Sequence, residues 1–202
     1  MSETITHESP LARFRLAARA TNAPDQACII ASERAFLGHF NLRGNAQDPR
    51  FVAAVHAALG AALPNRPNTV SEAPNVTLYW LGPDEWLIVT PPERCAAVES
   101  QLRKTSIGLR VAVTDLSGGQ TAVVLRGGPV RELVAKGCPL DLHPRVFGIG
   151  QCAQSHLAKA PILIRQLDGH PSFEIIIRRS FADYFWLWLE DAAAEYGFAV
   201  CA

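Results

Sequence analysis

The sequence predicts an α+β fold of two pseudo-repeated lobes, in each of which antiparallel strands have helices packed on one face. Two observations lead to this prediction. The order strand, helix, strand, strand, helix can be traced twice along the 202 residues. In both copies the opening β segment ends in Leu-Arg-Gly, at 42–44 and again at 125–127. A pattern that recurs within one chain is typical of a duplicated structural unit.

The first copy begins with a strand that leads into a helix. Asp48 is the expected N-cap of this helix and Pro49 lies in its first turn, where these residue types are favoured. A hairpin should follow, because β-forming residues flank the turn sequence Gly-Pro-Asp-Glu at 82–85. In order, the elements are a strand over 36–44, a helix over 48–63, the hairpin over 76–90 and a helix over 91–104.

Two turn signals organise the second copy. Ser-Gly-Gly at 117–119 separates two strands, and Asp-Gly at 168–169 separates two others. Gly137 stands where a helix C-terminal cap belongs, and we expect Ser180 to cap the last helix and Gly197 to end it. In order, the elements are two strands within 109–127, a helix over 128–137, strands over 151–160, 161–167 and 172–180, and a helix over 180–197.

Three parts of the chain follow from this pattern: an N-terminal arm over 1–26, a first lobe over 27–105 and a second lobe over 106–202. The arm holds one short amphipathic stretch, at 11–20, and a turn cluster at 21–25. Ten residues form only a marginal helix in isolation. The arm therefore either docks onto the rest of the protein or frays.

Composition excludes several classes of protein. Lysine plus arginine equals aspartate plus glutamate, 19 each, whereas nucleic-acid binders usually carry a basic surplus. The five cysteines are irregularly spaced, which argues against a disulfide framework and for a reducing compartment. The six histidines show no metal-ligand spacing. No secretory signal and no apolar run of about 20 residues is present, so we expect a soluble, cytoplasmic protein.

The candidate chemical groups have simpler structural interpretations. Arg-Gly-Gly-Pro at 126–129 is either a strand-to-helix turn or an anion site at the following helix. It lacks the lysine and hydroxyl of a Walker loop, and Leu-Arg-Gly recurs in the first copy, which favours a turn. Cys138, Asp141 and His143 could form a nucleophile, orienter and base. Catalytic triads are assembled from distant segments, however, which favours a buried structural cysteine here.

Two further segments with acidic residues are candidates for functional sites. Asp115 and Ser117 end a strand, where they can cap backbone groups in a tight turn; the functional alternative is a carboxylate that faces a ligand amine. Asp84 and Glu85 are adjacent on a turn, so their carboxylates point apart and cannot flank one bond. Trp86, directly after them, is expected to pack the hairpin onto a helix.

The last helix has more apolar surface than one core can bury. Placed at 100° per residue, its acidic side chains cluster on one side, and Trp186 and Leu187 fall at the edges of this polar stripe. Large apolar residues beside water suggest a contact surface. Trp186 and Leu187 are therefore candidate interface residues, either between the lobes or with another chain.

Three segments carry a resemblance to a known family: LGPDEWLIV at 81–89, VTDLSGGQTAVVLRGGPVRELVAKGCPLDLHPRVFGIGQCAQS at 113–155 and RRSFADYFWLWLEDAAAEYG at 178–197. In this order and at these distances they resemble the gamma subunit of heterotetrameric sarcosine oxidase. The similarity covers about 30–198. A more distant likeness runs to the folate-dependent aminomethyltransferases of glycine cleavage.

The resemblance implies an aminomethyltransferase-like fold and a non-catalytic accessory role. The family's complex oxidatively demethylates sarcosine to glycine and yields hydrogen peroxide and a one-carbon unit, as formaldehyde or methylene-tetrahydrofolate. The implied partners are the alpha, beta and delta subunits, with FAD, FMN, NAD and zinc held there. No catalytic, cofactor-binding or metal residue is implied in this chain.

Two alternatives stay open. One is a free-standing folate-binding or aminomethyltransferase-like protein, suggested by the Asp-Leu-Ser turn at 115–117 and by the two-lobed pattern, although the paired aspartates of those enzymes are missing. The other is a scaffold for a different oxidase or dehydrogenase of N-methyl amino acids.

Overall fold

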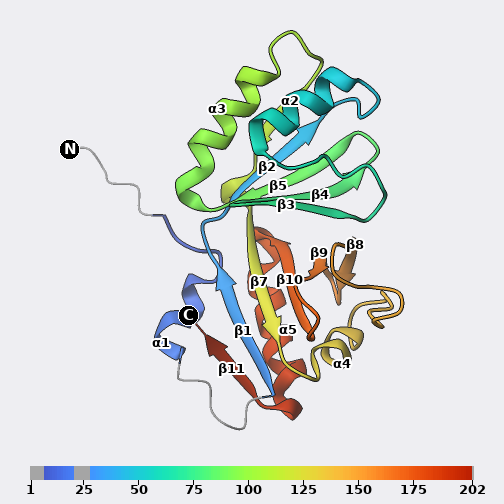
Figure 1. Cartoon of the computed structure of the whole chain (residues 1–202). Helices are drawn as coiled ribbons and strands as arrows, with labels where there is room; N and C mark the ends of the chain where they lie inside the picture. Colours follow the sequence, from blue (N-terminus) through green and yellow to red (C-terminus); the bar gives the residue numbers. More distant parts are fainter. Residues whose placement is uncertain (1–6, 21–27, 202) are drawn as a thin grey trace, which may run out of the picture.

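Two β-sheets pack against each other, and each is covered by helices on its outer face (Figure 1). The computed structural model describes residues 7–20 and 28–201. In the five-stranded sheet the order is β3 (Val70–Ala73), β4 (Val76–Gly82), β5 (Glu85–Thr90), β2 (Gly38–Arg43) and β6 (Ala112–Asp115). In the six-stranded sheet it is β11 (Phe198–Cys201), β1 (Ile29–Arg34), β7 (Gln120–Arg126), β10 (Ser172–Arg178), β9 (Ala160–Gln166) and β8 (Cys152–Leu157).

The helices in the described residues are short. The α-helices are α1 (Leu16–Arg19), α2 (Pro49–Leu59), α3 (Cys95–Thr105), α4 (Val130–Ala135) and α5 (Ala182–Ala193). Single 3-10 turns lie at Ala12–Phe14, Pro92–Arg94, Ser117–Gly119, Arg179–Phe181 and Ala194–Tyr196. Within the described part of the chain, none of these helices has the length and apolar character that crossing a membrane requires.

The topology confirms the predicted duplication. The elements β2-α2-β3-β4-β5-α3 repeat as β7-α4-β8-β9-β10-α5. Within the sheets the repeated strands also have the same order, β3-β4-β5-β2 in one and β8-β9-β10-β7 in the other. Each copy is therefore one α+β unit with four strands and two helices.

The expected lobe boundary at 105/106 does not separate the two sheets. Strand β1 precedes the first copy but pairs antiparallel with β7 of the second, and β6 precedes the second copy but pairs antiparallel with β2 of the first. Figure 1 shows β1 in one half of the molecule and β2 in the other. Within each copy, β2 and β7 are edge strands whose backbone N–H and C=O groups need hydrogen-bond partners. Strand β6 supplies them for β2, and β1 supplies them for β7. Consequently the two strands predicted within 109–127 belong to different sheets and form no hairpin.

Side-chain alternation divides the interior into three apolar layers. On β10, Phe173 and Ile175 point toward α4 and α5, whereas Ile176 points toward the five-stranded sheet. On β5, Ile88 points toward α2 and α3, whereas Val89 points toward the six-stranded sheet. The sheets are thus buried on both faces in their centres, and the layer between them joins the two copies.

Several predicted details of the helices need correction. The helix expected over 48–63 ends at Leu59, because Gly60 adopts a left-handed conformation and caps it; its N-cap, Asp48, is confirmed. Ser180 does not cap the last helix, which begins at Ala182 after a 3-10 turn and has no side-chain cap. Strands β1, β3 and β11 were absent from the expected elements.

Residues 7–20 of the arm dock onto the six-stranded sheet and α5. Leu11 and Leu16 are buried in the same core as the sheet, and the Phe14 ring lies 6.0 Å from that of Trp186. Docking is therefore the observed alternative for this part, while 1–6 and the turn cluster at 21–25 lie outside the described residues. Two ion pairs fix the arm to α5: Arg13 with Asp183 at 2.7 Å and Arg19 with Glu190 at 2.6 Å.

The glycines of the two Leu-Arg-Gly segments allow close packing. At Gly44 an added Cβ would lie 2.5 Å from the Phe51 ring, so α2 can approach the end of β2. At Gly127 it would lie 1.8 Å from the backbone oxygen of Cys28, and φ is +133° there. Both glycines thus mark a tight strand-to-helix turn, as predicted.

Gly127→Ala is expected to lower the free energy of unfolding by about 2 kcal/mol. The positive φ disfavours any side chain at this position, and an added Cβ would collide with the backbone oxygen of Cys28. The neighbouring Gly128→Ala is the matched control, since an added Cβ there meets nothing within 4 Å. Urea unfolding of both variants measures the difference. Equal stabilities would contradict the close approach of Cys28 to Gly127.

Candidate functional site

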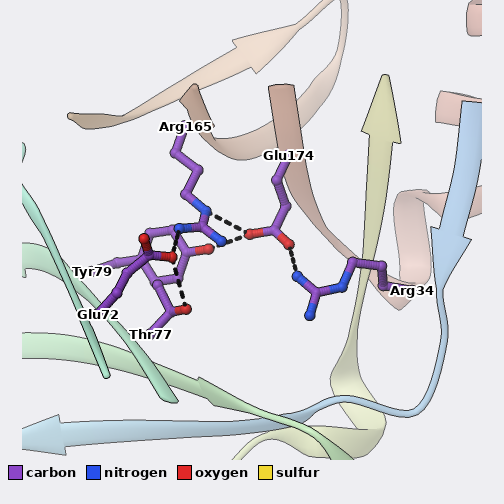
Figure 2. Close-up of polar contacts among 6 residues, drawn as sticks. All are labelled: Arg34, Glu72, Thr77, Tyr79, Arg165 and Glu174. Atoms are coloured by element: carbon purple, nitrogen blue, oxygen red, sulfur yellow. Dashed lines mark hydrogen bonds and ion pairs between the residues drawn. The ribbon is translucent and has the colours of Figure 1, made fainter. Parts of the chain in front are cut away.

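A cluster of charged side chains joins the two sheets (Figure 2). Its centre is Glu174 on β10, which is 1% exposed. Oε2 of Glu174 accepts a hydrogen bond from Nε of Arg165 on β9 at 2.9 Å and another from the Tyr79 hydroxyl on β4. Oε1 accepts from Arg34 on β1. We call these residues, with Glu72 and Thr77, the Glu174 cluster.

The strand register explains why these groups meet. Arg165 and Glu174 are directly opposite each other in the β9–β10 pair, and both point toward the five-stranded sheet. From that sheet Tyr79 reaches across to Glu174, and Glu72 on β3 pairs with Nη1 of Arg165. Thr77 donates a hydrogen bond to Glu72 at 3.5 Å. The Glu174 cluster therefore connects strands of both copies.

Electrostatics keep the cluster ionised. Burial alone would raise the pKa of Glu174, but Arg165, Tyr79 and Arg34 more than offset it, so this pKa lies below its ordinary value. Burial would lower the pKa of Arg165, yet Tyr79 and Glu174 raise it above its ordinary value. Burial and the Glu174 charge raise the pKa of Tyr79 well above its ordinary value, so its hydroxyl stays a donor. Since both oxygens of Glu174 are occupied, the carboxylate serves to join the sheets rather than to accept a proton.

His39 is another buried ionisable group between the sheets. It lies on β2, is 0% exposed, and neither ring nitrogen has a hydrogen-bond partner among the described residues. Burial lowers its pKa to about 4, although the nearby Leu37 backbone and the charges of Glu174 and Asp115 act in the opposite direction. At neutral pH the imidazole is therefore uncharged.

The Asp-Leu-Ser turn is held by its own side chains. Oδ1 of Asp115 accepts a hydrogen bond from the Ser117 amide at 2.8 Å, and the Ser117 hydroxyl accepts one from the His39 amide at 3.1 Å. The capping interpretation of Asp115 and Ser117 is thus confirmed. Asp115 and Ser117 also line a cleft of about 720 Å³.

Cys138, Asp141 and His143 do not form a catalytic arrangement. Cys138 is buried and its sulfur lies 3.7 Å from the Ser155 hydroxyl. Asp141 accepts from the amide of His143 at 2.9 Å, and Nδ1 of His143 accepts from the amide of Arg145 at 3.2 Å. These side chains therefore order the loop between α4 and β8. No group of three His, Cys, Asp or Glu side chains within 7–20 and 28–201 could hold a metal ion.

The remaining acidic candidates also have structural partners. Glu85 pairs with Arg43 at 2.6 Å, and Asp84 approaches the same guanidinium at 3.5 Å. Trp86 is buried, with its ring 5.7 Å from that of Phe51 on α2, which confirms that it packs the hairpin onto a helix. The segment 126–129 leads into α4, which has only six residues.

The two candidate interface residues of the last helix differ in their exposure to solvent. Trp186 is 0% exposed, because Phe14 of the arm and Phe198 of β11 cover its ring at 6.0 and 5.9 Å. Of the two alternatives for Trp186, a contact with another chain does not apply, because its ring is covered within the chain by the arm, of which the helical projection took no account. Leu187 is 50% exposed, next to the exposed Tyr184 on the same helix.

Comparison with known proteins places the chain in a family. The profile of the "Sarcosine oxidase, gamma subunit family" matches residues 43–195. The chain belongs to this family. It is 30% identical over 203 residues to the sarcosine oxidase subunit gamma of Corynebacterium sp. (strain U-96), across 100% of this chain and 97% of that protein. It is 34% identical over 145 residues to the subunit gamma of Arthrobacter sp., across 71% and 70%.

Solved structures agree with this assignment. A chain of the heterotetrameric sarcosine oxidase from Corynebacterium sp. U-96, in complex with pyrrole 2-carboxylate, matches with a TM-score of 0.85 and 30% identity, covering 97% of this chain and 99% of that one. Aminomethyltransferase T of the glycine cleavage system from Bartonella henselae matches with a TM-score of 0.66 and 15% identity, covering 95% and 58%. The second likeness shows a shared fold, and the predicted aminomethyltransferase-like fold is confirmed.

Proposed function

We propose that the chain is a non-catalytic gamma-type subunit of a sarcosine oxidase complex. The complex would oxidatively demethylate sarcosine to glycine and release hydrogen peroxide and a one-carbon unit, as formaldehyde or methylene-tetrahydrofolate. One observation carries the proposal: the similarity in sequence and structure to a chain of a heterotetrameric sarcosine oxidase extends over 97% of this chain.

An accessory role is supported by how the ionisable groups are used. The buried carboxylate of Glu174 is occupied by Arg34, Arg165 and Tyr79, and Asp115 caps a turn. In the proposed complex, FAD, FMN, NAD and zinc belong to the alpha, beta and delta subunits, which are the partners of this chain. The irregular cysteine spacing favours the cytoplasm as its location.

A contact surface for this role is available on α5. Leu187 is 50% exposed and Tyr184, one turn before it, is 37% exposed. Neighbouring exposed apolar side chains on a helix are typical of interface positions. We therefore assign Leu187 to the surface that contacts another subunit.

Affinity purification of the tagged chain from its native host tests the proposal. We expect flavin-bearing partner proteins in the eluate, together with flavin absorbance and sarcosine-dependent peroxide. Leu187→Asp should reduce partner recovery, whereas Glu99→Ala, at a surface ion pair on α3, is the control and should not. A colourless eluate without partners, or sarcosine oxidation by the chain alone, would overturn the proposal.

A further inference from the structure

The cleft beside the Asp-Leu-Ser turn has the properties of a ligand site. It measures about 720 Å³, within the range of roughly 300–1,000 Å³ that is usual for small-molecule sites. Its wall comes from the arm, the β1–β2 connection, the start of α3, the β6–β7 turn and the β10–α5 connection. Segments from both copies and from the arm therefore meet at one hollow.

An aromatic ring is held at this cleft by an unfavourable backbone. Phe36 lies in the short connection between β1 and β2, has φ of +62° and is 51% exposed. A bulky residue in the left-handed region is rare, and such residues are concentrated at functional sites. Pro92 contributes a further apolar side chain to the wall. A flat apolar group can therefore stack on Phe36.

Hydrogen-bond acceptors in the cleft lack donors. Oδ1 of Asp115 is used by the turn, but nothing in the described part of the chain donates to its Oδ2. Oε1 of Gln120, which lines the same cleft, is buried without a hydrogen-bond partner among those residues. A buried acceptor of this kind needs a partner. A ligand that carries N–H or O–H donors would supply one.

The charges favour a cation. The lining holds two acidic residues, Glu8 and Asp115, and one guanidinium, that of Arg179; His7, whose imidazole is uncharged in its basic form, lies there too. Part of the Arg179 donor capacity is already used, because its Nη1 donates to the backbone oxygen of Glu8 at 3.3 Å. The face of an aromatic ring such as Phe36 also attracts cations.

We propose that this cleft binds a small organic cation with a flat apolar body and N–H donors. The body would stack on Phe36, and the donors would face Asp115 and Gln120. The inference goes beyond the role in an oxidase complex and does not depend on it.

Benzamidine and benzoate are the probes, because they share size and ring but carry opposite charges. They are titrated into the full-length ¹⁵N-labelled chain, and the amide signals of Gly118 and Gly119, beside Asp115, are followed by NMR. We expect saturable shifts with benzamidine and binding of benzoate that is at least roughly tenfold weaker. No shifts, or equal affinity for both probes, would overturn the proposal.

Two variants test the assigned groups. Asp115→Asn keeps the oxygen that caps the turn and removes the charge, so benzamidine affinity should fall about tenfold or more. Phe36→Gly removes the ring and relieves the left-handed backbone, so affinity should fall while the Tm stays equal or rises. Unchanged benzamidine affinity in either variant would contradict the site as described.

Discussion

Replacing Glu174 with alanine is expected to lower the free energy of unfolding by about 3–5 kcal/mol, because it leaves a buried cation without its partner. Arg165 would keep only Glu72, which is largely exposed, and the Tyr79 hydroxyl would lose its acceptor. Equilibrium urea unfolding of the purified chain measures the change. The ion pair of Glu99 with Arg103 on the surface of α3 provides the control, since Glu99→Ala should cost less than about 1 kcal/mol.

A combined substitution separates the loss of an ion pair from the loss of packing. In the variant Glu174→Met, Arg165→Met and Tyr79→Phe, the central charges and the hydroxyl that depends on them are removed together. Replacing a whole buried ionic network with apolar side chains is often neutral, so we expect this variant to be more stable than Glu174→Ala. If Glu174→Ala lost less than about 1 kcal/mol, the Glu174 cluster would not be what fixes the two sheets together.

The repeat unit could be predicted from the sequence because its signals are local. The cap at Asp48, the turn at 82–85 and the Asp-Gly turn at 168–169 each act within a few residues. The strand exchange could not be predicted in this way. Whether β1 pairs with β2 or with β7 depends on edges that form only when both copies have folded, and the residues paired in β1 and β7 are about 90 apart in the sequence.

The Glu174 cluster was missed for a similar reason, although part of it left a signal. Arg165 and Glu174 each interrupt an apolar strand, and the Asp-Gly turn between them places them opposite each other. Opposite charges at paired positions in two buried strands predict an ion pair. Arg34 and Tyr79 left no such signal, because they reach Glu174 from strands that are 140 and 95 residues away in the sequence.

Trp186 shows the limit of a helical projection. The projection correctly placed Trp186 beside the acidic stripe, and its Nε1 donates a hydrogen bond to Glu190 at 2.8 Å. It could not show that the arm returns to cover the ring, because a short amphipathic stretch gives no indication of where it docks.

Stability should fall as the pH is lowered from about 6.5 toward 4, because burial lowers the pKa of His39 from 6.5 to about 4 on folding. The unfolded chain therefore binds a proton in this range that the folded chain excludes, which lowers the free energy of unfolding. The full loss is about 3 kcal/mol, of which about 2 kcal/mol should be reached by pH 5. Urea unfolding at a series of pH values measures it.

The control must separate the proton taken up by His39 from those taken up by the charged groups around it. The Leu37 backbone, Glu174 and Asp115 favour its protonation, but burial, together with the charge of Arg34, outweighs them. The pKa of Glu174 is lowered, so its contribution is present above its unfolded value and is lost only at lower pH. His39→Leu should consequently flatten the profile between about pH 6.5 and 5 and leave the acid limb in place. A slope that persists in His39→Leu would assign the effect to other groups and would show that His39 can take up a proton in the folded state.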